Sequence, residues 1–230
     1  MVLPIGPPAP PTPATTPTHV NLHGRYTSVL PMSTDHSASL FTHVGGKHNV
    51  PRWTYMTRPG FPTLQSFEDY TAECIASADP LFFSILTGPA SDPASEAAGI
   101  VSYLSIVPDH LRIEIGSVIL GDKLARTRAA TEAFFLMIQH AFDLGYHRVE
   151  WKANNLNAPS RSAAARLGFV FEGVFRNHMV VKGHMRDTAW FSITSDEWPG
   201  VKKGFDAWLS ESNFDADGKQ LRTLKDCREN

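Results

Sequence analysis

The sequence predicts an α/β or α+β fold built around one mixed β-sheet. Three observations predict it. Strand-like segments in the first half alternate apolar and polar residues with a period of two, a long segment at 126–144 repeats apolar residues with helical spacing, and strand-like and helix-like segments then alternate. Antiparallel strands followed by strand–helix–strand–helix–strand require a sheet of both orientations with helices packed on it.

The elements of the first half follow from this patterning. Apolar alternation and turn-forming residues between segments predict a strand at 25–30, a helical region from Ser33 or Asp35, a loop-rich segment at 45–62, an amphipathic helix at 64–77, and strands at 81–86, 99–106 and 111–120. In the helix at 64–77, Leu64, Phe67, Tyr70 and Cys74 share one face.

The second half begins with the helix at 126–144, which Gly145 is expected to end. Gly168 is expected to end a second helix in the same way. The remaining pattern predicts a strand at 147–153, a short helix at 158–167, strands at 169–175, 179–181 and 188–193, and a last helix bracketed by Pro199 and Trp208.

The chain divides into a domain with two tails. Seven of the 17 prolines lie in the first 17 residues, so we expect 1–19 to be a disordered, proline-rich tail. The folded domain is expected at 20–209, and a polar, poorly ordered tail at 210–230. A length of 230 residues suits one such domain.

Composition excludes several classes of protein. Hydrophobic residues make up 42% of the chain, and its net charge of -2 argues against a nucleic-acid binder. No apolar run is long enough to span a membrane, and the start lacks the pattern of a secretory signal. Cys74 and Cys227 are the two cysteines, so we expect neither a disulfide framework nor a metal site. These features predict a cytoplasmic protein.

Two segments carry the functional signal. In 113–133 a strand runs into a short loop and then a helix that begins with small residues; free backbone N–H groups and the helix dipole at such a junction suit a pyrophosphate. In 157–169, Asn157 and Ser160 precede an alanine-rich helix, where they either cap the helix or donate to a ligand. Taken singly, each segment is equally consistent with a purely structural role.

Together these segments resemble motifs A and B of the GNAT superfamily of N-acetyltransferases. The similarity is closest to the branch that contains the RimJ/RimL-type acetylases of ribosomal-protein N-termini, and it covers about 24–209. It rests on the phrases AATEA at 129–133, EWK at 150–152, NAPS at 157–160, RLGFVFEGVFR at 166–176 and RDTAW at 186–190.

The resemblance implies a mostly antiparallel sheet that splays in the middle, is flanked by helices, and binds acetyl-CoA in the opening. Carried over to this chain, it places Asn157 on the pantetheine arm and Ser160 near the thioester sulfur. The strand edge that hydrogen-bonds the pantetheine arm would be Ser117, Val118, Ile119 and Leu120. The backbone amides on the pyrophosphate would be those of Arg126, Thr127, Arg128, Ala129, Ala130 and Thr131.

The chain departs from the family pattern at two places. The family's pyrophosphate loop reads Gln/Arg-x-x-Gly-x-Gly/Ala, and here Ala125 takes the first position and Arg128 the first glycine position, while Ala130 agrees. Arg128 must therefore keep a negative φ and turn its side chain away from the phosphates or around them. Ala164 occupies the position where many members carry a tyrosine acid.

The reaction that the resemblance implies is acetyl transfer to a primary amine of a protein N-terminus or a small molecule. Glu114 is the first candidate for the general base, with a surface ion pair to Arg112 as the structural alternative, and Glu150 is the second. A backbone N–H near Val118 would polarise the carbonyl.

Trp53, Tyr55 and the rest of the region at 45–62, together with the hairpin at 175–187, are expected to border the acceptor. His178 and His184 flank this hairpin and are interpreted as surface residues, with contact of one of them to the substrate as the alternative. The competing hypothesis is an inactive module that binds CoA or a partner protein. Either a monomer or a homodimer is compatible with the sequence.

Overall fold

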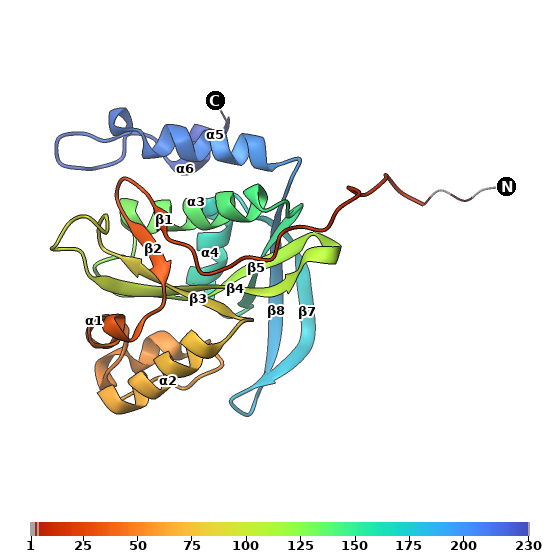
Figure 1. Cartoon of the computed structure of the whole chain (residues 1–230). Coiled ribbons are helices and arrows are strands. Elements are labelled where there is room, and N and C mark those ends of the chain that lie inside the picture. The colour runs from red at the N-terminus through yellow and green to blue at the C-terminus, as the bar shows by residue number, and fades with distance from the viewer. Residues whose placement is uncertain (1–2, 4, 230) are drawn as a thin grey trace.

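The fold is one eight-stranded mixed sheet between two layers of helices (Figure 1). The structure is a computed structural model that describes residue 3 and residues 5–229. Its strands lie in the order β1-β2-β3-β4-β5-β6-β8-β7. They are β1 (Leu22–His23), β2 (Ser28–Pro31), β3 (Leu81–Leu86), β4 (Ala97–Val107), β5 (Arg112–Leu120), β6 (Arg148–Asn154), β7 (Val170–Val181) and β8 (His184–Thr194).

Helices cover both faces of the sheet. Figure 1 shows one group of helices on each side of the sheet. One group is α1 (Ser37–Val44) and α2 (Leu64–Ala76); the other is α3 (Arg128–Asp143), α4 (Ala158–Leu167), α5 (Trp198–Leu209) and α6 (Leu224–Glu229). Each layer has its own apolar core, one centred on Phe83, Met137 and Phe205, the other on Leu40 and Trp53.

The sheet opens between β5 and β6. This pair is parallel, and its register covers only three positions, which end at Glu114 opposite Glu150. Beyond that point β6 continues in register with β8, whereas the rest of β5 has no strand on that side. The predicted splay in the middle of the sheet is therefore present.

A bulge in β5 shapes the same region. The pairing with β4 shifts between Ile100 and Ser102, so that β5 gains one residue, and Ser117 adopts a left-handed φ of 52°. An extra residue reverses the alternation of side chains. Ile113 and Ile115 pack in the core beside α3, whereas Ile119 packs in the core beside α2. The simple period of two expected for this strand therefore breaks at Ser117.

Order extends further into both ends than expected. Residues 1, 2 and 4 of the predicted disordered tail lie outside the described residues. Within the rest, the backbone N–H of Ala14 donates to Pro108 O at 3.2 Å, and that of Thr15 donates to Leu144 O at 2.8 Å. These two hydrogen bonds hold the proline-rich segment against the surface of the domain. At the other end, α6 buries Leu224 and Cys227.

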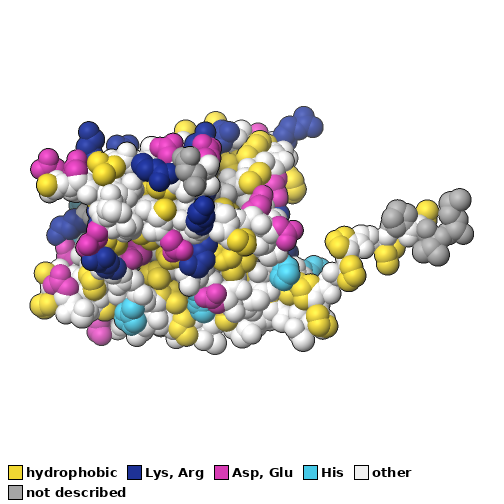
Figure 2. Space-filling view, turned by 90° about the horizontal axis from the view of Figure 1, so that it is seen from above, with side chains coloured by type: hydrophobic (Ala, Val, Ile, Leu, Met, Phe, Trp, Pro, Cys, Tyr) yellow, Lys and Arg dark blue, Asp and Glu magenta, His cyan; other side chains and the backbone are white. Residues whose placement is uncertain are grey.

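The surface carries charges of both signs. In Figure 2, which looks onto the α5–α6 side, Lys and Arg side chains lie among Asp and Glu side chains, in keeping with the net charge of -2. Across the described part of the chain, we find no helix with the length and apolar content needed to cross a lipid bilayer.

Candidate active site

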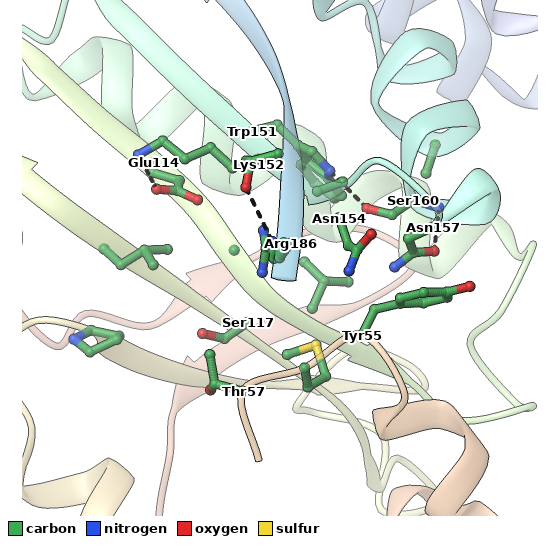
Figure 3. A pocket seen from close by; sticks show the side chains of 18 of the residues that line it. Tyr55, Thr57, Glu114, Ser117, Trp151, Lys152, Asn154, Asn157, Ser160 and Arg186 are labelled. Carbon is green, nitrogen blue, oxygen red and sulfur yellow. Dashed lines mark hydrogen bonds and ion pairs between the residues drawn. The ribbon is translucent and has the colours of Figure 1, made fainter. Parts of the chain in front are cut away.

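A cavity of about 570 Å³ occupies the opening between β5 and β6. Its walls come from β4, β5, β6, the start of α4, the loop before α2 and the β7–β8 hairpin (Figure 3). Six of the predicted site residues line it: Glu114, Ser117, Val118, Leu120, Asn157 and Ser160. The structure thus brings both functional segments of the sequence to one place.

Glu114 is a buried carboxylate on the cavity wall. It is 5% exposed, its Oε2 accepts from Ser105 Oγ at 3.1 Å, and the same oxygen lies 2.8 Å from Lys152 Nζ. Burial raises the pKa of Glu114 above its ordinary value, while Lys152 and Ser105 oppose that shift. A buried carboxylate with a raised pKa suits a general base that works near neutral pH.

Glu150 lies outside the cavity. Arg148 Nε is 2.8 Å from its carboxylate, Lys152 Nζ is 3.3 Å away, and Arg112 Nη1 is 3.7 Å away. Three cations therefore hold Glu150 inside an ion cluster. The structural alternative for Glu114, an ion pair with Arg112, is not formed among the described residues: Arg112 pairs with Glu150, and Glu114 pairs with Lys152.

Asn157 and Ser160 perform the capping role and leave donors for a ligand. Asn157 Oδ1 accepts from the backbone N–H of Ser160 at 3.2 Å, and its Nδ2 has no partner among the described residues. Trp151 Nε1 donates to Ser160 Oγ at 3.1 Å. Because an indole N–H only donates, the Ser160 hydroxyl proton remains available for a further hydrogen bond.

The loop at the start of α3 lies outside the cavity lining, and only part of it is free to bind an anion. The amide of Thr127 donates to Leu124 O, that of Ala130 to Thr127 Oγ1, and that of Thr131 to Thr127 O. Within the described part of the chain, the amides of three residues in the predicted set have no partner: Arg126, Arg128 and Ala129. Of the six backbone amides predicted to bind the pyrophosphate, these three are therefore free to donate to it.

Arg128 has the negative φ that the sequence analysis required, and its side chain turns away from the loop. It is the first residue of α3, and its guanidinium carbon lies 3.2 Å from the ring centroid of Phe214 and 4.6 Å from that of Tyr26, away from the loop. The left-handed backbone falls instead on Arg126, with φ of 65°. The Arg126 side chain is exposed at the same junction.

The acceptor side of the cavity contains residues that the sequence identified only as a region. Tyr55, Met56 and Thr57 line the same cavity as Met179 and Arg186 of the β7–β8 hairpin. Lys182, at the tip of this hairpin, donates from Nζ to the carbonyls of Trp53 at 2.9 Å and Thr54 at 2.8 Å, and so ties the two walls together.

His178 lines the cavity, whereas His184 and Trp53 do not; Trp53 lines the adjoining hollow of about 270 Å³. Sequence reasoning missed Lys152, Ser105 and Arg186. The alternation within EWK, which places residues 150 and 152 on one face, was the available signal for Lys152.

The comparisons with known proteins agree with this geometry. The family model described as an acetyltransferase (GNAT) domain matches residues 29–170. A GCN5-related N-acetyltransferase from Brucella melitensis is 41% identical, with a TM-score of 0.90 over 95% of this chain and 98% of that one. A probable GNAT-family acetyltransferase from Chromobacterium violaceum is 35% identical, with a TM-score of 0.76 over 86% of this chain and 100% of that one.

A more distant structure shares the fold. RimJ of Mycobacterium smegmatis, solved in complex with CoA-disulfide, is 22% identical, with a TM-score of 0.63 over 82% of this chain and 92% of that one. The curated proteins gave no match. The matched family model and the identity to the two bacterial structures establish that this chain belongs to the GNAT acetyltransferase family, whose cosubstrate is acetyl-CoA.

Proposed function

We propose that this protein is an N-acetyltransferase that moves the acetyl group of acetyl-CoA to a primary amine by direct attack in a ternary complex. The observation that carries the proposal is the separation of β5 from β6 after Glu114, which leaves a cavity with a buried carboxylate on one wall and Asn157 and Ser160 on another. The RimJ/RimL-like phrases at 157–160 and 166–176 favour a peptide N-terminus as acceptor over a small-molecule amine.

The residues present suit the cosubstrate. Past Glu114, the edge of β5 offers backbone donors and acceptors that no strand uses, as an extended pantetheine arm requires. Asn157 Nδ2 lies at the same cavity, and the free amides of Arg126, Arg128 and Ala129 lie at the N-terminus of α3, where a helix dipole favours an anion. Bound acetyl-CoA supplies an activated acetyl thioester.

The side chains then act on the amine proton and on the charge of the leaving group. Glu114, directly or through one water, accepts the proton that the attacking amine gives up. The Ser160 hydroxyl donates a hydrogen bond to the sulfur as the C–S bond breaks and CoA leaves as the thiolate, which takes its proton from solvent, while a backbone N–H near Val118 donates a hydrogen bond to the thioester oxygen. Holding amine and thioester in one cavity contributes a large share of the rate in its own right.

Binding of acetyl-CoA is the first test. Acetyl-CoA at a hundredfold excess over its Kd is expected to stabilise the native protein by about 2.7 kcal/mol, because it binds only the folded state. The measurement is the thermal midpoint with acetyl-CoA, with CoA, and with ATP as a polyphosphate nucleotide that lacks the pantetheine arm. A shift with both CoA species and not with ATP supports the cleft, and release of free thiol with added amines then reports transfer.

The opposite outcome is equally informative. If millimolar acetyl-CoA leaves the thermal midpoint where it was, the chain has no working cosubstrate site, and the proposed activity is wrong. Binding of CoA without thiol release from any amine or peptide would instead identify a CoA-binding module.

A further inference from the structure

Among the described residues that line the cavity, charged side chains include one more cation than carboxylate. Among the side chains that line it, Glu114 is the carboxylate, and Lys152 and Arg186 are the cations. Lys152 Nζ lies 2.8 Å from Glu114 and so accounts for its charge. Within the described residues, no carboxylate oxygen lies within 4.0 Å of the Arg186 guanidinium, so this cation is left over.

Arg186 is held in a fixed position toward the cavity. It lies on β8, and its Nε donates to Thr188 Oγ1 at 3.2 Å. Thr188 is 1% exposed, and its hydroxyl is also 3.0 Å from His178 Nδ1, which anchors it from the neighbouring strand. With Nε used in this way, the two terminal nitrogens of Arg186 project into the cavity between Lys152 and Ser117 (Figure 3).

This arrangement is unfavourable without a ligand. Arg186 is partly buried, and burial lowers the pKa of its guanidinium, while the charge of Glu114 opposes that shift. A buried cation without a partner is costly, and the planar fork of a guanidinium is complementary to a carboxylate or a phosphate. The nearest carboxylate on the cavity wall, Glu114, is already paired with Lys152.

We propose that Arg186 binds an anionic group, a carboxylate or phosphate, carried by the same molecule as the amine to be acetylated. This inference rests on the proposed function, because Glu114 and Arg186 line one cavity and would hold the amine and the anion of one acceptor. Arg186 is then a specificity-determining residue: it selects acceptors by their charge and orients the amine toward Glu114.

The test is a length series of acceptors. Each ω-amino acid with one to five methylene groups is compared with the ω-amino amide of the same length, and an amino-alkyl phosphate series distinguishes the two anions. At the best length, wild type is expected to show a kcat/KM at least tenfold higher for the anion than for the neutral amide, which equals about 1.4 kcal/mol. Arg186→Gln is expected to lose this preference, measured as the ratio of kcat/KM for the anion to kcat/KM for the neutral amide, and to keep its affinity for acetyl-CoA.

Arg176→Gln is the matched control. It removes the same charge from an exposed position of the same hairpin, outside the cavity lining, and is expected to keep the preference for anions. Equal use of anionic and neutral acceptors by wild type at every length overturns the proposal, and this comparison needs no variant to fold. An Arg186→Gln variant that loses activity equally on both series assigns Arg186 a structural role and overturns it as well.

Failure of the proposed function gives a different result, in which no amine of either series releases thiol. Binding then decides the anion site. In the presence of CoA, the anionic ligand should raise the thermal midpoint of wild type and not that of Arg186→Gln, whereas equal shifts in both proteins refute the site.

Discussion

Glu114→Gln is expected to lower kcat/KM for acetyl transfer by about 10²–10⁴-fold and to leave the Kd for acetyl-CoA unchanged. Glutamine keeps the volume of the side chain and the hydrogen bond from Ser105, but it cannot accept a proton at physiological pH. Because Glu114 faces the acceptor cavity and is 5% exposed, few water molecules are available to replace it as a base. Steady-state kinetics with a fixed amine, together with acetyl-CoA titration, measures both quantities.

The pH profile gives an independent signature of the same role. Burial raises the pKa of Glu114 above the ordinary value of 4.5, and only the ionised form acts as a base. The acid limb of kcat/KM in wild type should therefore lie above pH 4.5, with activity rising as pH increases through the pKa of this carboxyl. In Glu114→Gln that limb should vanish, while the limb at higher pH, set by deprotonation of the acceptor amine, should remain.

Glu150→Gln separates the two candidate bases. It makes the same substitution on the adjacent strand, where Arg148 and Lys152 hold the carboxylate outside the cavity. We expect it to alter stability and to retain the acid limb of the pH profile. A loss of that limb in Glu150→Gln, with Glu114→Gln close to wild type, would transfer the role of base to Glu150.

Local patterning predicted the bounds of several elements. The strand at 81–86 and the helix expected at 158–167 have these bounds in the structure, and the helix expected at 64–77 ends one residue earlier. Thr63 and Asn157 accept a backbone N–H at the two helix starts, and Gly168 takes the left-handed φ of 105° that ends α4. These signals lie within a few residues of the boundary, so a single sequence contains them.

Contacts between segments far apart in the chain could not be predicted from the sequence. The pairing of Lys152 with Glu114 depends on which strands become neighbours, and the packing of Arg128 on Phe214 joins the start of α3 to a segment expected to be poorly ordered. The bulge at Ser117 likewise follows from the register with β4. The two expected strands at 169–175 and 179–181 form the single strand β7, because β8 pairs along both with a register shift between them.

Glu132 makes a contact of this kind, to a segment about a hundred residues earlier in the chain. It belongs to the phrase AATEA that carried the family resemblance, yet it is 6% exposed and points toward the turn between β1 and β2. Its carboxylate accepts the backbone N–H groups of Arg25 at 2.9 Å, Tyr26 at 2.6 Å and Thr27 at 2.9 Å. A Cβ on Gly24 would lie 2.3 Å from its Oε2, so a larger residue there would displace the carboxylate.

Glu132→Ala is therefore expected to lower the free energy of unfolding by about 3 to 5 kcal/mol. The substitution leaves three backbone N–H groups without an acceptor, and the acceptor that it removes is a charged carboxylate, which makes stronger hydrogen bonds than a neutral group. For a chain of this size, the thermal midpoint should fall by about 10 °C. Urea unfolding measures the free energy directly. Glu68→Ala, an exposed position within α2, is the matched control and should change it by no more than about 0.5 kcal/mol.

The sign of the Glu132 result decides between two physical accounts. If the three amides hold the carboxylate as argued, Glu132→Gln should fall between wild type and alanine, since one amide oxygen remains to accept while the NH₂ group faces donors. If instead the cost of burying the charge outweighs these hydrogen bonds, Glu132→Ala should match Glu68→Ala or exceed wild type in stability. The three short contacts to one carboxylate favour the first account, in which Glu132 fixes the β1–β2 turn against α3.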